Sequence, residues 1–346
     1  MDKENDMLRI LIETVIKKTI KEISDSPERS IRNWVNMALD FSEGKFQRTF
    51  FKTADDMLKN KKSPYYDLIK DSAANTDEER LLQFGMNLCY NSCTIGVRKI
   101  LENEILYGFN IPWTVSFRMS GEHISENSEI YDRIITQGED LGIYTWMLYL
   151  NGELGEALPL VQKHTDSAFI LFCEPKDITD DFLDNMCDVK NVMLAVRYEE
   201  NNENLYYRLR ENRLLYSTYY IYDDENAESI INGDFFYDAV QFHPLFTAVI
   251  PGESCSEETG ERVYKAVTSY RRKQSFQTIV WDVNRDNSNI NSIISDEACN
   301  VSFDFEGGFY VRHREKVSLN LFGHNLRNIL KRTYPKESVQ IKRNDD

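Results

Sequence analysis

Hydrophobic positions in the first eighty residues repeat with the spacing of helices. The residues that recur every three or four positions at the start of the chain are Leu8, Leu11, Ile12, Val15, Ile16 and Ile20. Ser24-Asp25-Ser26-Pro27 then offers capping side chains and a proline suited to a first helical turn. The pattern predicts a helical N-terminal segment over residues 1–80, without strands.

From residue 81 the pattern changes to short apolar runs that alternate with polar, helix-like stretches. The runs cover residues 81–88, 114–119, 144–150, 168–173, 192–198, 214–222, 239–242 and 276–283. Most are rich in β-branched or aromatic residues and alternate weakly, as strands buried on both faces do. Strand–helix alternation predicts an α/β fold, namely a TIM-like (β/α) barrel over 81–285. An open doubly wound sheet is the alternative.

Beyond the last run the pattern predicts a separate C-terminal extension over 286–346. Val301-Ser302-Phe303-Asp304-Phe305 alternates, Glu306-Gly307-Gly308 suits a turn, and Phe309-Tyr310-Val311 alternates again. This is the pattern of a β-hairpin, in which glycine supplies the positive φ of the turn. A final helix is expected over 319–330.

The charge of the chain restricts its partners. Its net charge of −16 disfavours unspecific binding to phosphate backbones, so nucleic acid is not an expected partner. The best candidate for a local basic patch is Arg271-Arg272-Lys273, at the end of a predicted helix. Cations at that place also suit the helix dipole, which gives them an ordinary structural explanation.

The localisation follows from three negative observations. The first six residues are too polar to open a signal peptide, and no apolar run approaches the roughly 18 residues that span a bilayer. Six cysteines in a chain of this length do not make a dense disulfide framework. The sequence therefore predicts a cytoplasmic protein without a membrane partner.

Candidate chemistry follows the predicted strands, because β/α barrels carry their sites at the carboxyl ends. Cys89 and Cys93 follow the first run, Ser120-Gly121-Glu122-His123 the second, and Leu150-Asn151-Gly152 the third. Arg197 closes the fifth run and is expected to contact an anion or a carboxylate, since a guanidinium at such a place needs a partner.

These landmarks resemble those of radical S-adenosylmethionine enzymes. In that family, three cysteines after the first strand hold a [4Fe-4S] cluster, and Cys89 and Cys93 match the first two in spacing. The resemblance also implies that Gly121, Glu122 and Asn151 contact S-adenosylmethionine. The third cysteine position is Gly96, which cannot ligate, and losing one thiolate of three should weaken or abolish the cluster. Cys173 is a candidate substitute; otherwise Cys89 and Cys93 are small buried residues.

Three functional hypotheses remain open at this point. The first is a radical-enzyme-like pseudoenzyme of peptide maturation, which binds a peptide or S-adenosylmethionine and works beside an active paralogue. The second is an ordinary barrel enzyme whose acid–base groups, with or without a divalent metal, are Glu122, His123, Glu174, His243 and Asp282. The third is an interaction scaffold. His243, beside Pro244, is otherwise interpreted as a buried histidine with satisfied hydrogen bonds.

Overall fold

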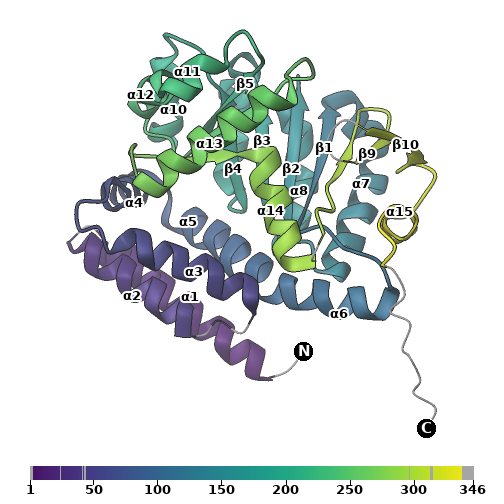
Figure 1. Cartoon of the computed structure of the whole chain (residues 1–346), viewed down its shortest axis with the longest axis horizontal. Helices are drawn as coiled ribbons and strands as arrows, with labels where there is room; N and C mark the ends of the chain where they lie inside the picture. The colour runs from purple at the N-terminus through teal and green to yellow at the C-terminus, as the bar shows by residue number, and fades with distance from the viewer. Residues whose placement is uncertain are drawn as a thin grey trace.

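The computed structural model describes residues 3–336 except 24, 41, 43, 296 and 312–314, and its centre is one large sheet (Figure 1). The sheet has ten strands in the order β10-β9-β8-β1-β2-β3-β4-β5-β6-β7. Their bounds are β1 (Thr114–Ser120), β2 (Thr145–Asn151), β3 (Ala168–Cys173), β4 (Val192–Arg197), β5 (Tyr216–Tyr222), β6 (Phe246–Pro251), β7 (Ile279–Asp282), β8 (Val301–Phe303), β9 (Gly308–Val311) and β10 (Glu315–Asn320).

The strands confirm the α/β class and its barrel-like arrangement. β1 to β7 pair in parallel with their neighbours in chain order, and β8 pairs in parallel with β1 on its other side. Among the described residues no pairing joins β7 to β8, so hydrogen bonds do not close the ring there. The chain instead crosses from β7 to β8 through a helix.

The helical N-terminal segment is confirmed. It forms α1 (Lys3–Glu22), α2 (Pro27–Asp40), α3 (Lys45–Leu58) and α4 (Pro64–Asn75), which lie along the bottom and left of Figure 1. The core between them contains Ile23, Ile31, Val35, Leu58 and Tyr66. Pro64 stands in the first turn of α4, and the Ser63 side chain caps that helix by accepting a hydrogen bond from the Tyr65 N–H.

The remaining helices connect the strands or precede them. They are α5 (Glu78–Gly85), the π-helix η1 (Met86–Gly96), α6 (Val97–Tyr107), α7 (Gly121–Leu141), α8 (Leu158–Lys163), α9 (Asp180–Asn185), α10 (Glu203–Glu211), α11 (Ala227–Asn232), α12 (Asp234–Ala239), α13 (Glu257–Lys273), α14 (Val283–Ser295) and α15 (Leu326–Thr333). Four short 3₁₀ turns complete the path: η2 (Leu154–Ala157), η3 (Pro175–Asp177), η4 (Met186–Asp188) and η5 (Val240–Phe242).

Two of the eight predicted strands are wrong. Residues 81–88 are helical, because the Asp77 side chain caps α5 and the Arg80 side chain is buried against the Met186 and Val189 carbonyls. Residues 239–242 are also helical, and the sixth strand begins later, at Phe246. Both errors fall on short apolar runs, whose periodicity does not separate a buried strand from a buried helix.

Helix α14 packs on the face of the sheet that would be the inside of a closed barrel. Val283, in its first turn, shares a hydrophobic cluster with Met147, Phe172 and Tyr219, which come from three different strands. Further along α14, the Asn287 amide lies 3.5 Å from the Met147 sulfur. Figure 1 shows the helix crossing in front of the strands. This face, called the inner face below, is therefore partly filled by the chain itself.

The C-terminal hairpin is confirmed. β8 and β9 pair antiparallel through Ser302 and Tyr310, and Gly307 in the turn has a φ of +71°. The final helix, α15, begins at Leu326 and not at 319, because the antiparallel strand β10 occupies the residues up to Asn320. The division into segments 1–80, 81–285 and 286–346 stays a prediction.

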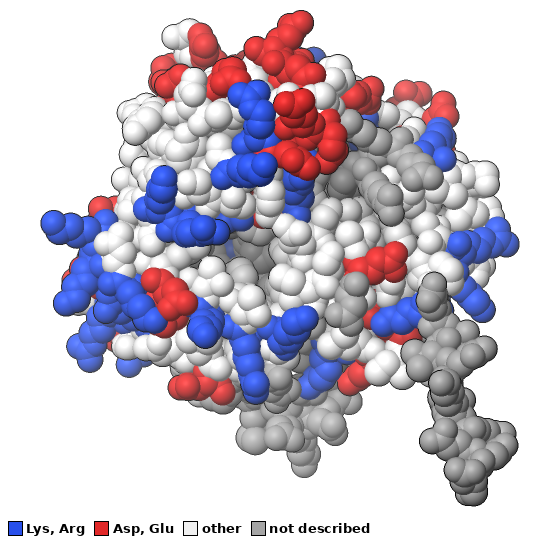
Figure 2. Space-filling view, in the orientation of Figure 1, with Lys and Arg blue, Asp and Glu red and all other residues white. Residues whose placement is uncertain are grey.

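Charge is unevenly distributed over the surface. Figure 2 shows Asp and Glu gathered along the top of the molecule and Lys and Arg across the left and the lower part. The top carries the loops that follow the strands, and the lower part carries the N-terminal helices (Figure 1). Within the described part of the chain, no helix has an apolar stretch that could cross a membrane.

Candidate functional site at the carboxyl ends of the strands

A row of side chains crosses the inner face near the carboxyl ends of the strands. Arg118 pairs in register with Tyr149, Tyr149 with Phe172, and Arg197 with Tyr219. Register partners in a parallel sheet point to the same face. With two carboxylates from the following loops, this group is called the strand-end site; it consists of Arg118, Tyr149, Phe172, Glu174, Arg197, Tyr219 and Glu253.

Aromatic rings form the floor of the strand-end site. The ring of Tyr149 stacks on that of Phe172 with 4.3 Å between centroids, and Phe172 meets Tyr219 edge-on at 5.3 Å. Burial raises the pKa of both tyrosines above their ordinary value, so their hydroxyl groups stay protonated at neutral pH. The floor is therefore apolar and uncharged, with hydroxyl groups at its edges.

Arg197 contacts a carboxylate, as expected for a guanidinium at a strand end. Its Nη1 lies 3.2 Å from Oε1 of Glu174, the residue that follows β3. The Tyr219 hydroxyl is 3.5 Å from the same carboxylate oxygen. The side chains of Arg197 and Glu174 are 43% and 26% exposed, so both reach solvent and a ligand could exchange for either partner.

Arg118 forms a second pair across the opening of the sheet. Its Nη1 lies 3.4 Å from Oε1 of Glu253, which follows β6. The two side chains are 52% and 90% exposed. At such exposure the contact adds little to stability, so these groups are available to a ligand.

Gly121 and Glu122 stand at the start of α7, as predicted for residues after a strand. The Ser120 hydroxyl caps this helix by accepting from the His123 N–H, and it lies 2.6 Å from His123 Nδ1. A Cβ on Gly121 would lie 2.9 Å from the Cβ of Glu153, so close packing alone requires this glycine. Glu122 is exposed. The turn is thus explained by helix capping, whether or not it holds a ligand.

Asn151 ends β2 at the rim of the same site. It is exposed, and it shares the inner face with Tyr149 because it lies two residues further along the strand. Gly152 follows with a φ of +81°, and its N–H donates to Asp177. The structure therefore brings Asn151, Arg197 and the start of α7 to one end of the sheet.

Cys89 and Cys93 lie at the opposite end. Both belong to η1, which packs against the amino ends of β2 and β3: Ser92 is hydrogen-bonded to Thr145, and Asn87 donates to the Ser167 carbonyl. The prediction that these cysteines follow a strand is wrong, because the run before them is helical. They share no opening with Asn151 and Arg197.

The residues around the cysteines do not fit a [4Fe-4S] cluster. Burial raises the pKa of Cys89 to about 11 and also raises that of Cys93, so both are neutral thiols in the metal-free protein. At the third motif position, a Cβ on Gly96 would lie 2.5 Å from the Gly142 carbonyl oxygen. The described residues include no group of three or more His, Cys, Asp or Glu side chains that could hold a metal ion.

Cys173 does not complete such a set. It ends β3 as predicted, but it is fully buried and its thiol lies 3.7 Å from the Ala195 carbonyl oxygen. Burial raises its pKa strongly. Cys173 is thus a core residue of the outer side of the sheet, one position away from Phe172 on the inner face.

The acid–base residues of the alternative enzyme hypothesis do not converge. His243 precedes β6 and so lies toward the amino ends, with a φ of +54° and a half-exposed side chain. The interpretation of His243 as a buried histidine is therefore wrong. Asp282 lies at a strand end but is fully buried, and its Oδ1 accepts from the Arg285 N–H at the start of α14. Burial raises the pKa of Asp282 to about 7, with a further contribution from Asp286.

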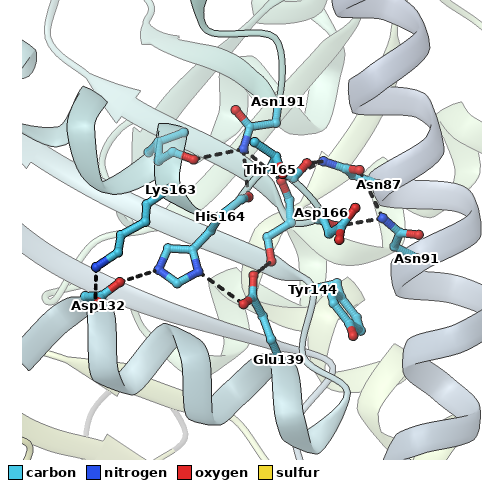
Figure 3. Close-up of polar contacts among 12 residues, drawn as sticks. Asn87, Asn91, Asp132, Glu139, Tyr144, Lys163, His164, Thr165, Asp166 and Asn191 are labelled. Atoms are coloured by element: carbon cyan, nitrogen blue, oxygen red, sulfur yellow. Dashed lines mark hydrogen bonds and ion pairs between the residues drawn. The ribbon is translucent and has the colours of Figure 1, made fainter. Parts of the chain in front are cut away.

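A polar network near the amino ends escaped the sequence analysis (Figure 3). His164 is 5% exposed, and its two ring nitrogens lie 3.1 Å from Glu139 and 3.1 Å from Asp132, both on α7. Ser167 donates to Glu139 and Lys163 pairs with Asp132. The spacing of Asp132 and Glu139, two helical turns apart, was the available signal.

Asparagines extend this network to η1 and β4. Asn87 and Asn91 on η1 donate to the carbonyls of Thr165 and Asp166, and Asn191 donates to those of Val161, His164 and Ser167. The loop before β3 is thereby held on two sides (Figure 3). In β/α folds this end of the sheet serves stability, and the network fits that role.

Comparisons with known proteins find distant matches among solved structures, at low sequence identity. No protein-family model matches the chain, and no curated protein matches it. Among solved structures, Streptococcus suis SuiB bound to S-adenosylmethionine has a TM-score of 0.48 and 10% identity over 67% of each chain. SuiB bound to its precursor peptide SuiA has a TM-score of 0.47 and 12% identity over 67% of this chain and 68% of that one. The structure of SuiB by itself has a TM-score of 0.47 and 10% identity, over 86% of this chain and 81% of that one.

Proposed function

We propose that this chain binds a peptide or an S-adenosylmethionine-like ligand at the strand-end site, without an iron–sulfur cluster. The observation that carries the proposal is the pair of guanidinium–carboxylate contacts, Arg118–Glu253 and Arg197–Glu174, beside one stacked aromatic floor. Side chains from β1 to β5 and from the loop after β6 contribute to this arrangement. It lies at the carboxyl ends of the strands, where β/α proteins carry ligand sites.

The two contacts suit a ligand that carries both an ammonium and a carboxylate group. Arginine donates in a planar fork that matches a carboxylate, and glutamate accepts from an ammonium group. The α-amino acid part of S-adenosylmethionine and the ends of a peptide have this chemistry. The rings of Tyr149 and Phe172 offer a flat surface for an apolar side chain or an adenine ring.

Gly121, Glu122 and Asn151 complete the proposal as contacts at the rim. Glu122 and Asn151 are exposed, and both stand at the end of the sheet that carries Arg197. Glu122 adds a third carboxylate, beside Glu174 and Glu253, for a ligand's ammonium group. Gly121 keeps the turn compact, so that the first turn of α7 stays near Glu153.

We further propose that a bound S-adenosylmethionine is held and not cleaved. Gly96 is packed against Gly142, and Cys89 and Cys93 lie on a helix at the other end of the sheet, so the chain's own residues argue against a cluster beside the ligand. A protein of this kind would serve peptide maturation as a pseudoenzyme. Its expected partners are a peptide substrate and an active radical-enzyme paralogue.

Titration calorimetry with three ligands tests the proposal. S-adenosylmethionine carries the amino-acid group, 5′-methylthioadenosine lacks it, and a short peptide with free ends carries its charges without adenine. Arg197→Gln should weaken S-adenosylmethionine or peptide binding about tenfold, a change typical of losing one polar contact with a charged group. Binding of 5′-methylthioadenosine should not change.

Arg9→Gln is a matched control. Arg9 pairs with Asp166 at 3.3 Å, and its side chain is 43% exposed, like that of Arg197. Asp166 lies near the amino ends of the strands, so the control removes an equal charge away from the site. Equal losses in both variants, or no binding of any of the three ligands, would contradict the proposal.

A further inference from the structure

Two basic segments that are far apart in the sequence lie side by side at the end of α13. The Gln274 side chain donates to the Met57 carbonyl at 2.8 Å and accepts from Asn60 at 3.4 Å, and the Tyr65 hydroxyl lies 3.4 Å from the Arg271 carbonyl. These contacts join the loop between α3 and α4 to the end of α13. Lys61 and Lys62 follow Asn60 directly, and Arg272 and Lys273 directly precede Gln274. These four exposed cations form the basic patch.

The cations of the basic patch are not neutralised by their neighbours. Lys59, just before the patch, pairs with Asp55 and Asp56, and Arg271 is held by Asp286 in two hydrogen bonds of 2.7 and 2.8 Å. The four members of the patch form no ion pair with any described carboxylate. Figure 2 shows Lys and Arg gathered on the left of this face, where α13 ends over the N-terminal helices.

The geometry at Gln274 fixes the patch in place. Gln274 is a non-glycine residue with a φ of +55°, and it is only 9% exposed. Such a backbone conformation is held only where the surroundings support it, here by contacts to Met57 and Asn60. The helix dipole explains one pair of cations at the end of α13, but it does not explain Lys61 and Lys62 on the facing loop.

An exposed aromatic ring packs on the segment that follows the basic patch in the chain. Tyr237 on α12 is 63% exposed, and its ring packs edge-on against Phe276 with 5.0 Å between centroids. Phe276 follows Gln274 by two residues, so this contact joins α12 to the segment that leaves the end of α13. Tyrosine and arginine are both among the residue types enriched in the energetic centres of protein interfaces.

We propose that the basic patch docks an acidic segment of a partner protein. The chain carries a net charge of −16, so a long polyanion would be repelled by the rest of the surface. A short acidic segment interacts mainly with the charges within one Debye length, roughly 8 Å at physiological salt. It can therefore meet the four cations locally, while an apolar side chain of the segment contacts Tyr237. This proposal does not depend on the strand-end site.

Fluorescence anisotropy with a labelled peptide of alternating Glu and Leu tests the docking. Charge reversal by Arg272→Glu with Lys273→Glu should weaken binding about tenfold, since two weak surface attractions become repulsions. Lys61→Glu with Lys62→Glu should do the same, although these residues belong to a loop and not to a helix end. Binding to the unaltered protein should weaken as salt is raised.

The matched control reverses the two cations Lys331 and Arg332. They also end a helix, α15, which lies on the other side of the molecule (Figure 1), and both are exposed. Lys331→Glu with Arg332→Glu should change peptide binding less than about twofold. Melting curves by circular dichroism check that all variants stay folded.

Several outcomes overturn the proposal. They are equal losses in the control and in both patch variants, no binding of the acidic peptide, and tighter binding of a single-stranded RNA oligonucleotide or of anionic lipid vesicles than of the peptide. Loss in both patch variants, with the control unchanged, supports it.

Discussion

Arg118 and Glu253 meet with 3.4 Å between their Nη1 and Oε1 atoms, although β2, β3, β4 and β5 lie between their strands. In a flat sheet, β1 and β6 would be about 24 Å apart, from a strand spacing of about 4.8 Å. The contact therefore requires a strongly curved sheet. It also brings the two edges of the strand-end site, at the ends of β1 and β6, into contact.

Replacing Arg118 or Glu253 should affect ligand binding and not stability. Both side chains are more than half exposed, so Arg118→Gln and Glu253→Gln should each change the free energy of unfolding by less than about 1 kcal/mol. Each should weaken a ligand that carries both charges. Urea unfolding measures the stability and calorimetry measures the ligand binding of the same preparations. A large loss of stability would show that the pair serves the fold.

Gly96→Cys should not restore an iron–sulfur cluster. The new Cβ would lie 2.5 Å from the Gly142 carbonyl oxygen, so the substitution should destabilise the protein by about 1–3 kcal/mol, as overpacking does. Gly85→Cys is the control, since a Cβ there meets nothing within 4 Å. Iron analysis after anaerobic reconstitution, with urea unfolding, measures both effects. A stable variant with a stoichiometric cluster would contradict the account.

Asp282→Asn should make stability less dependent on pH. Burial raises the pKa of Asp282 to about 7, so between about pH 4 and 7 the folded state binds more protons than the unfolded state. The stability of the unaltered protein then falls as pH rises through that window. Asparagine keeps an acceptor for the Arg285 N–H but carries no charge.

Between pH 5 and 8, the free energy of unfolding of the variant should therefore rise by about 3 kcal/mol relative to that of the unaltered protein. The figure follows from about 1.4 kcal/mol per pKa unit. Urea unfolding at both pH values measures this, with the exposed Glu258→Gln as control. A difference that does not change with pH would refute the assignment of a raised pKa to Asp282.

His164→Gln should loosen the amino ends of β2 and β3. The His164 ring lies 3.1 Å from both Asp132 and Glu139, and removing a hydrogen-bonded side chain at a nearly buried place costs about 1–3 kcal/mol. Amide hydrogen exchange should rise in η1 and at the start of β3. His243→Gln, at a half-exposed histidine, should have little effect. Equal effects of both substitutions would count against the role given to His164.

Most of the fold could be predicted from the sequence, because long and repeated patterns carry it. Six parallel strands and the hairpin with Gly307 lie close to where their apolar runs predicted them. Residues 81–88 were predicted as a strand because they form a short apolar run. The features that make them helical are the N-cap at Asp77 and the burial of Arg80 against a distant loop. Only the second of these requires the tertiary structure.

The positions of some candidate residues in the fold could be predicted from the sequence. Arg197 and Asn151 lie at the expected end of the sheet, because parallel strands bring their carboxyl ends together. Cys89 and Cys93 do not lie there, because their predicted place depended on a strand over residues 81–88 that is a helix in the structure. Arg118 and Glu253 were missed, because only the curvature of the sheet brings β1 near the loop after β6. His164 was missed because its partners are separated from it by 25 and 32 positions.

Hydrogen–deuterium exchange with and without saturating ligand tests the central claim most directly. The ligand is S-adenosylmethionine or the free-ended peptide, whichever binds more tightly. The account predicts slower exchange in residues 118–123, 173–177 and 197–200, and no change in η1 (Met86–Gly96). Slower exchange in η1, with the strand ends unchanged, would place the ligand at the cysteines and contradict the account.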